Sequence, residues 1–229
     1  MASQEPELVL YTYFRSSCAA RVRTAAALKG IPLRFEYVNL LNGDQTSPLY
    51  TSGLNPSATV PTLVANCPDG RHLIRQSIAI LEYFEEAYPA PKYTPLLPPA
   101  NQPLRRAAVR DLVNILCVDI QPKTNLSVIK HLENKYGIAP LGWNQEQMLL
   151  GLKAYEALLK ETTGKYSVGN EITLADVCLA PAIESALRWQ VDLTHTPEIV
   201  RVYNNIKGLP AFVEADWRHQ ADTPANLKC

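Results

Sequence analysis

Three small polar side chains that could act on a thiol stand together near the start of the chain. Ser16, Ser17 and Cys18 follow the apolar run LVLYTYF and precede an alanine-rich stretch with helical composition. A hydroxyl can donate a hydrogen bond to a sulfur anion, and the positive potential at a helix N-terminus stabilises a thiolate. That thiolate could belong to Cys18 or to a bound thiol. Serine before a helix is also ordinary capping chemistry.

A proline and a glutamine–serine pair are the next candidates. Pro61 lies inside the strand-like run TVPTLV, where proline normally marks an edge strand. Alternatively, a cis Val60–Pro61 bond in a turn before the strand would leave the Val60 backbone able to pair with a peptide-like ligand. Ser77 could cap the helical run that it opens, or this helix start could bind a ligand carboxylate while Gln76 adds an amide.

Three arginines could bind anions, although simpler interpretations exist for each. Arg21 and Arg23 fall within the first helical run, where solvated helix charges are the simpler interpretation. Arg188 lies near the end of a later helical run. It could cap carbonyl groups there, or it could pair with a substrate carboxylate.

The elements that must position these side chains alternate in the first part of the chain. The predicted elements are a strand over 8–14, a helix over 18–29, strands over 33–40, 59–66 and 71–75, and a helix over 77–88. The sequence Pro68-Asp69-Gly70 has the composition of a hairpin turn. A β-α-β unit followed by a β-hairpin and a helix predicts an α/β domain.

A proline-rich stretch divides the chain. Six prolines lie in the stretch from Pro89 to Pro103, so we predict a domain over 1–88, a linker over 89–102 and a second domain over 103–229. The second domain has the composition and apolar periodicity of an all-helical unit. One of its helices is expected to start with a capping box formed by Thr173 and Asp176, and Pro181 should kink this helix or lie in its early turns.

Composition excludes several classes of function. The chain has 22 basic and 22 acidic residues, without the basic excess of a nucleic-acid-binding protein. No run of 18 apolar residues and no signal-peptide pattern occur, so we expect a cytoplasmic protein without a membrane span. The five cysteines are widely spaced and form no C-x-x-C, and the four histidines show no ligand spacing. We therefore expect neither a disulfide framework nor a metal site.

Taken together, these features resemble the cytosolic glutathione transferases over nearly the whole chain. The segment RSSCAARVR resembles the signature of the zeta class, the maleylacetoacetate isomerase family. The segments NPSATVPTLV, QSIAILEYFEE, DIQPKTNLSVI and TLADVCLAPAIESALRWQVDLTHTP follow in the order of that family. The resemblance implies a thioredoxin-like N-terminal domain (α/β) followed by an all-helical glutathione-transferase C-terminal domain.

The resemblance also implies roles for individual residues. Ser16 would stabilise the glutathione thiolate, while Ser17 and Cys18 would line the same pocket, with Cys18 assisting. The residues that it assigns to glutathione are Ser16, Ser17, Cys18, Ala19, Ala20, Arg21, Gln45, Val60, Pro61, Gln76, Ser77, Gln121, Asn125, Leu126 and Ser127. Arg188 matches an arginine implicated in recognition of a substrate carboxylate. Ala19 and Ala20 are smaller than the residues often found there, and Lys123 adds a charge.

The function that the resemblance implies is a glutathione-dependent cis–trans isomerisation of maleylacetoacetate to fumarylacetoacetate, in the breakdown of tyrosine and phenylalanine. The thiolate would add to the conjugated double bond, the resulting single bond would rotate, and elimination would return glutathione. Neither a metal nor a net redox change is required. The small-molecule substrate would be a dicarboxylate keto acid, and the family implies a homodimer.

Three other functions remain open at the level of the sequence. The same thiolate site could serve a broader glutathione transferase that conjugates electrophiles or dehalogenates α-haloacids. A non-catalytic module used in protein assembly could keep the fold, although the intact SSCAARVR segment argues against it. A thiol–disulfide oxidoreductase could use Cys18, but no resolving cysteine lies nearby.

Overall fold

The computed structural model of this protein describes residues 5–228, which form two compact units. Described residues up to Pro95 and from Pro210 onward make up the first unit, and Leu96–Leu209 make up the second. The proline-based boundaries at 1–88, 89–102 and 103–229 remain a prediction. The compact units differ from them by grouping the C-terminal segment with the first unit.

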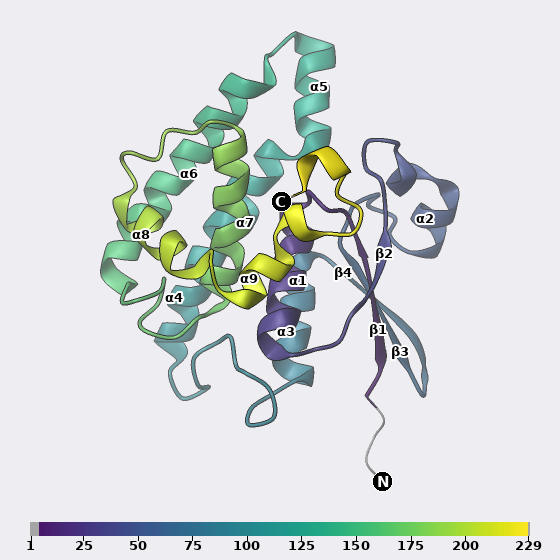
Figure 1. The fold of residues 1–229 in the computed structure, drawn as a ribbon, viewed down its shortest axis with the longest axis horizontal. Helices are drawn as coiled ribbons and strands as arrows, with labels where there is room; N and C mark the ends of the chain where they lie inside the picture. Colours follow the sequence, from purple (N-terminus) through teal and green to yellow (C-terminus); the bar gives the residue numbers. More distant parts are fainter. Residues whose placement is uncertain (1–4, 229) are drawn as a thin grey trace. The chain divides into compact units, whose positions relative to one another are not determined.

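The first unit contains a four-stranded sheet in the order β2-β1-β3-β4 (Figure 1). Its strands are β1 (Glu7–Thr12), β2 (Arg34–Tyr37), β3 (Thr62–Cys67) and β4 (Gly70–Arg75). β1 runs parallel to β2 and antiparallel to β3, and β3 is antiparallel to β4. This mixed sheet is the one expected for a thioredoxin-like domain, and the predicted fold class is confirmed.

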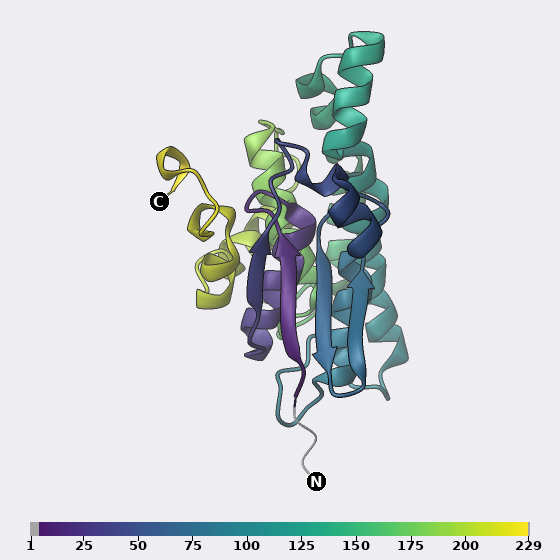
Figure 2. The same cartoon turned by 90° about the vertical axis from the view of Figure 1, so that its right-hand side faces the viewer.

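Helices cover both faces of this sheet. α1 (Ser17–Lys29) and α3 (Ser77–Ala87) pack against each other on one face, and α2 (Pro48–Gly53) lies on the other (Figures 1 and 2). A short helix near the C-terminus, α9 (Pro210–Ala215), packs against α1. The largest fully buried side chains of this unit are Leu10, Leu63, Ile80, Leu81 and Phe84.

The alanines of α1 allow neighbouring elements to approach it closely. Ala19 and Ala25 are completely buried, and the helix ends at Gly30, whose φ of 68° lies in the left-handed region. A glycine adopts this conformation without the steric cost that a Cβ would add. The helix therefore ends with the basic Lys29 in its last turn and Gly30 as its C-cap.

The second unit is all-helical in the part of the chain that the structure describes. Its elements are α4 (Pro103–Asn114), a π-helical turn η2 (Ile115–Ile120), a 3₁₀ turn η3 (Gln121–Thr124), α5 (Leu126–Tyr136), α6 (Pro140–Thr162), α7 (Leu174–Arg188) and α8 (Pro197–Ile206). The capping box of Thr173 and Asp176 is present at the start of α7, and Pro181 lies inside this helix. No helix of the described residues is both long and apolar enough to cross a membrane.

Several element boundaries differ from the sequence-based prediction. The first strand ends at Thr12 instead of residue 14, because the chain turns there toward Ser16. The second strand is shorter than predicted, and α2 was missed altogether. The final helical stretch of the chain is divided into α8 and α9, with Gly208 and Pro210 at the break.

Candidate active site

Ser16 occupies the N-cap of α1, as the capping interpretation predicts. Its backbone is extended, with φ −77° and ψ 113°, and its Oγ accepts a hydrogen bond from the Ala19 N–H at 3.1 Å. A hydroxyl has one proton to donate as well as lone pairs to accept. Because the cap uses only a lone pair, the Ser16 proton can still be donated to a sulfur anion. Capping and thiolate stabilisation are thus compatible in one side chain.

Ser17 and Cys18 form the first turn of α1 beside this cap. Both side chains, like that of Ser16, are half-buried, so they are accessible to a small ligand. The N–H groups of a first helical turn have no carbonyl partner within their own helix. Together with the helix dipole they favour a negative charge at this point. The structure therefore brings together the hydroxyls and the positive potential that a bound thiolate requires.

Arg21 is a buried residue that connects the starts of two helices. It is 2% exposed, and its Nη1 donates to Ser77 Oγ at 3.1 Å and to Cys18 Sγ at 3.7 Å. The interpretation of Arg21 as a solvated helix charge is therefore wrong. Its buried guanidinium instead holds the first turn of α3 to the first turn of α1.

The start of α3 differs from the simple cap that the sequence suggests. Gln76, not Ser77, occupies the N-cap position, and its side chain makes no capping hydrogen bond. The Ser77 capping interpretation is therefore wrong, since this buried hydroxyl accepts from Arg21 instead. Gln76 has φ 72°, a left-handed conformation that costs a residue with a Cβ about 1–3 kcal/mol and occurs most often at ligand sites.

The turn before β3 contains the cis Val60–Pro61 bond that one sequence interpretation predicts. The edge-strand alternative is wrong, because β3 pairs with β1 on one side and β4 on the other. Pairing of β3 starts at Thr62, so the buried Val60 lies outside the register of the sheet. The turn is held by the Thr59 carbonyl, which accepts from Tyr50 Oη at 2.8 Å and from Asn55 Nδ2 at 3.0 Å.

Gln45 provides the clearest test of whether a polar ligand fits this unit. It lies in a short 3₁₀ turn, η1 (Asp44–Thr46), and its Oε1 is buried without a hydrogen-bond partner among the described residues. A buried amide oxygen without a donor is costly in a folded protein. The amide and ammonium groups of glutathione are donors of the kind that this oxygen lacks. The Gln45 acceptor therefore fits a ligand with such donors.

The predicted site residues of the second unit occur on separate helical elements. Gln121 opens η3, and Asn125 caps α5 by accepting from both the N–H and the Oγ of Ser127 at 3.0 Å. Leu126 is the first residue of α5. Arg188, the last residue of α7, is exposed and donates to Ser185 Oγ at 3.2 Å.

The sequence also misjudged Arg23. This residue is 3% exposed and donates to backbone and hydroxyl oxygens, so it is not a solvated charge either. Burial lowers its pKa to about 10, which leaves it charged at neutral pH. No local pattern reveals this burial, because its partner in α9 lies 192 positions further along the chain.

One group of potential metal ligands lies outside this site among the described residues. Cys67, Asp69 and His72 place their ligand atoms within 4.8 Å of one another at the β3–β4 turn. Asp69 and His72 are more than half exposed, and the hydrogen bond between them lowers the pKa of Asp69. This arrangement is accounted for by a local turn pair, and we assign it no metal. No disulfide bond joins the described cysteines Cys18, Cys67, Cys117 and Cys178.

Two protein-family models match the chain. "Glutathione S-transferase, N-terminal domain" matches residues 15–87, and "Glutathione S-transferase, C-terminal domain" matches residues 144–210. The first match starts at the turn that carries Ser16 and ends with α3, so it spans the site of the first unit. The fold and the site thus define the class of the glutathione S-transferases.

Curated relatives and solved structures narrow this class. The chain is 45% identical to the maleylacetoacetate isomerase maiA of Aspergillus fumigatus, and the match covers 99% of this chain and 97% of that protein. It is 42% identical to the maleylacetoacetate isomerase of Rattus norvegicus, and that match covers 96% of this chain and 97% of the rat protein. It resembles the glutathione-bound structure of the maleylacetoacetate isomerase from Anaeromyxobacter dehalogenans 2CP-1, with a TM-score of 0.87, 36% identity and coverage of 96% and 100%. Another structure of that bacterial protein contains dicarboxyethyl glutathione and citrate in its active site. The chain belongs to the maleylacetoacetate isomerase family, the zeta class of glutathione transferases.

Proposed function

We propose that this protein is a glutathione-dependent isomerase that converts maleylacetoacetate to fumarylacetoacetate. The observation that carries the proposal is the start of α1, where Ser16, Ser17 and Cys18 surround the N-terminus of a helix. The chain is 45% identical over nearly its whole length to a relative named for this reaction, which supports the same substrate here. A glutathione-bound structure of a relative supports the cofactor.

When bound, glutathione supplies a thiolate that adds reversibly to a double bond conjugated to a carbonyl, so that the bond can rotate before elimination. Ser16 donates its hydroxyl proton as a hydrogen bond to the sulfur, and the first turn of α1 adds positive potential. Both interactions favour the thiolate over the thiol and so lower the thiol pKa. Cys18 lines the same pocket and assists, while Ser17 presents a second hydroxyl.

The remaining residues of the first unit hold the peptide part of glutathione. Val60 pairs its backbone with the cysteinyl portion, because this backbone lies outside the β3 register. Ser77 and Gln76 bind the γ-glutamyl end, and Arg21 fixes the Ser77 hydroxyl by its 3.1 Å hydrogen bond. Gln45 offers its buried Oε1 as an acceptor. Gln121, Asn125, Leu126 and Ser127 are proposed to contact glutathione by family resemblance.

The substrate is a dicarboxylate, and Arg188 is proposed to bind one of its carboxylates. An arginine suits this role because its planar guanidinium can donate two parallel hydrogen bonds to a carboxylate. Dicarboxyethyl glutathione and citrate in a relative's active site support a site for acidic ligands. Negative charge that develops on the substrate enolate is stabilised by Arg188 or by the helix N–H groups.

The test is turnover of maleylacetoacetate with and without glutathione, with S-methylglutathione as a control that keeps the peptide but lacks the thiol. We expect isomerisation with glutathione alone, and a loss of about 100-fold or more in kcat for Ser16→Ala, as when an anion-stabilising donor is removed. Wild-type protein that binds glutathione tightly but does not isomerise would contradict the proposal.

The outcome of this experiment also separates the alternatives. Conjugation of electrophiles or dehalogenation of α-haloacids without isomerisation would identify a broader glutathione transferase. Binding without any turnover would identify an assembly module. A thiol–disulfide oxidoreductase would lose all activity in Cys18→Ala, whereas the isomerase is expected to keep part of its turnover in this variant.

The proposal includes a cellular setting that follows from the family. The protein acts in tyrosine and phenylalanine breakdown in the cytoplasm, and it forms a homodimer. Light scattering coupled to gel filtration tests the dimer, since a monomeric mass at working concentration would exclude it. Fractionation of cells that express the natural protein tests the location.

A further inference from the structure

Arg23 forms a hydrogen-bond network that the proposed chemistry does not use directly. Its Nη1 donates to Thr12 Oγ1 at 2.9 Å and to the Tyr13 carbonyl at 3.4 Å, and its Nη2 donates to the Phe14 carbonyl at 3.1 Å. The same guanidinium reaches α9, where Nε and Nη2 donate to the Ala215 carbonyl at 3.2 and 3.1 Å. One buried cation therefore joins the loop before Ser16 to the C-terminal segment.

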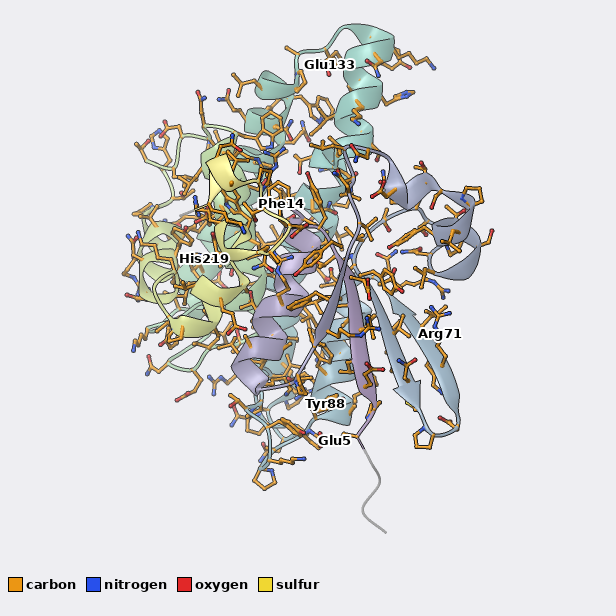
Figure 3. All side chains as sticks on the ribbon, turned by 45° about the vertical axis from the view of Figure 1, so that its right-hand side comes forward. Glu5, Phe14, Arg71, Tyr88, Glu133 and His219 are labelled. Carbon is orange, nitrogen blue, oxygen red and sulfur yellow. The ribbon has the colours of Figure 1, made fainter. Side chains whose placement is uncertain are left out.

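Asp222 holds the same loop through the backbone N–H of Phe14. Its Oδ2 accepts the Phe14 N–H at 2.8 Å, while the Phe14 carbonyl accepts from Arg23. Both backbone polar groups of Phe14 are thus fixed by residues that do not belong to the loop. Figure 3 labels Phe14 beside the C-terminal segment, which is coloured yellow.

The loop held in this way ends directly at the catalytic serine. The Tyr13 carbonyl, an acceptor for Arg23, also accepts the Ser16 N–H at 3.0 Å. Tyr13 and Phe14 are buried in a cluster with Val60, against which Trp217 packs. The position of the Ser16 hydroxyl therefore depends on a turn whose carbonyls and N–H are held by Arg23 and Asp222.

The C-terminal segment is itself fixed well enough to serve as an anchor. Gln220 is buried, and its Nε2 donates to the carbonyls of Glu214 and Asp216 at 2.8 and 2.9 Å. Thr223 is also buried and donates to the Trp217 carbonyl. These side-chain-to-backbone bonds close the segment around Trp217, so the Ala215 carbonyl and the Asp222 carboxylate have fixed positions.

The hydrogen-bond acceptors around Arg23 favour a guanidinium over any other cation. Asp222 and Asp216 both act on it electrostatically, and four oxygen atoms of the protein accept its protons. A lysine at this position keeps the charge but carries a single nitrogen with three donors, which cannot reach Thr12, Phe14 and Ala215 together. Charge alone is therefore insufficient, and the fork-like geometry is required.

We propose that Arg23 and Asp222 are positioning residues. Through them the C-terminal segment 215–222 holds the loop before Ser16, and this loop directs the Ser16 hydroxyl toward the glutathione sulfur. This inference rests on the proposed role of Ser16 as thiolate donor. A displacement of about 1 Å in a reacting group can cost about 100-fold in rate. The network thus makes the C-terminal segment part of the catalytic machinery, although it supplies no group that touches glutathione.

The test compares Arg23→Lys, Asp222→Ala and Asp222→Asn with wild type. Asparagine keeps an oxygen that can accept the Phe14 N–H, so it should restore most of what alanine loses. The matched control is Arg201→Lys, the same exchange at an arginine that contacts Thr163 and Glu198 in the second unit. Each folded variant is titrated with glutathione bound, by ultraviolet absorbance of the thiolate, and is then assayed for turnover.

We expect Arg23→Lys and Asp222→Ala to raise the pKa of the bound thiol and to lower kcat by about tenfold to a hundredfold, with little change in KM for glutathione. Arg201→Lys should match wild type in both measurements. A wild-type thiol pKa and kcat in both Arg23→Lys and Asp222→Ala would overturn the inference. If Arg23→Lys does not fold, the comparison of Asp222→Ala with Asp222→Asn tests the inference by itself.

The thiol titration keeps this inference distinct from the proposed reaction. Wild-type protein that ionises bound glutathione without isomerising maleylacetoacetate would contradict the proposed function alone. A shift of the thiol pKa in Asp222→Ala that Asp222→Asn reverses would still support the positioning role. The absence of any such shift in the same protein would contradict it.

Discussion

At the scale of the residue, Ser16 shows how one side chain can be both structural and chemical. Its oxygen accepts the Ala19 N–H and so caps the helix, while its proton remains available for a ligand. The sequence suggested both roles but could not join them, because whether a cap leaves the hydroxyl proton free depends on the geometry of the turn. In the structure the cap uses only an oxygen lone pair, so the proposed second role can use the proton of the same group.

A pair of serine substitutions separates these roles. Ser47 caps α2 in the same way, by accepting the Tyr50 N–H at 3.2 Å, and this makes it a matched control. Loss of an N-cap serine costs about 0.5–2 kcal/mol, so Ser16→Ala and Ser47→Ala should lower the free energy of unfolding by similar amounts. Only Ser16→Ala should lower turnover. Chemical denaturation and a rate assay on both variants check this, and equal rates would place Ser16 outside the chemistry.

Asp222 predicts a dependence of stability on pH. Burial raises the pKa of this carboxyl above its ordinary value of 3.8. The folded state then holds the proton more tightly than the unfolded state, so the contribution of this group is fully present at low pH and is lost as pH rises through the folded pKa. The stability of wild type relative to Asp222→Asn should therefore fall as pH rises above 3.8 and through the higher pKa of the folded state. Denaturation of both proteins at a series of pH values measures this relative stability. An increase with pH would contradict the raised pKa of Asp222.

At the scale of the element, features that depend on neighbouring residues could be predicted from the sequence. Features that depend on contacts between distant residues could not. The capping box of Thr173 and Asp176 was found because both residues lie within one turn. The burial of Arg23 was missed because Ala215 lies 192 positions away. The apolar periodicity of the second domain indicates helix but does not reveal the π-helical turn Ile115–Ile120, since periodicity does not resolve one extra residue in a turn.

This π-helical turn packs tightly against a glycine of the helix that it contacts. A Cβ built on Gly151 of α6 would overlap Ile120 Cγ1 and lie 2.6 Å from its Cδ1. Gly151→Ala should therefore lower the free energy of unfolding by about 1–3 kcal/mol, the usual cost of overpacking. Gly142 lies in the same helix with open space around it, so Gly142→Ala should be neutral or stabilising. Urea denaturation measures the free energy of unfolding of both variants. Equal values would show that the Ile120 side chain moves to accommodate the added methyl group.

At the scale of the whole molecule, the first compact unit is built from both ends of the described chain. The described C-terminal segment returns to the unit that contains Ser16, after the helical unit is complete. A division at the proline-rich stretch could not reveal this return, because it depends on contacts between the two ends of the chain. The resemblance to the family, in contrast, predicted the fold and most candidate residues, since its motifs are spread over the full length.

Truncation tests the importance of this return. A stop codon after Leu209 would remove α9 and with it the Ala215 and Asp222 contacts, exposing the α1 surface that α9 covers. We expect loss of glutathione binding or of the folded first unit. A stop codon after Ala225 keeps these contacts and should preserve the wild-type melting temperature and turnover. Calorimetry and binding measure both proteins, and normal activity of the shorter one would show that the segment is dispensable.

The most direct test of the account is the pH titration of glutathione bound to wild type and to Ser16→Ala, followed by the ultraviolet absorbance of the thiolate. A cysteine thiol without a protein environment ionises near pH ~8.5. We predict that the wild-type protein lowers the pKa of the bound thiol to neutral pH or below, and that Ser16→Ala returns it toward the free value. A wild-type complex whose thiol titrates like free glutathione would contradict the central claim that the start of α1 stabilises a bound thiolate.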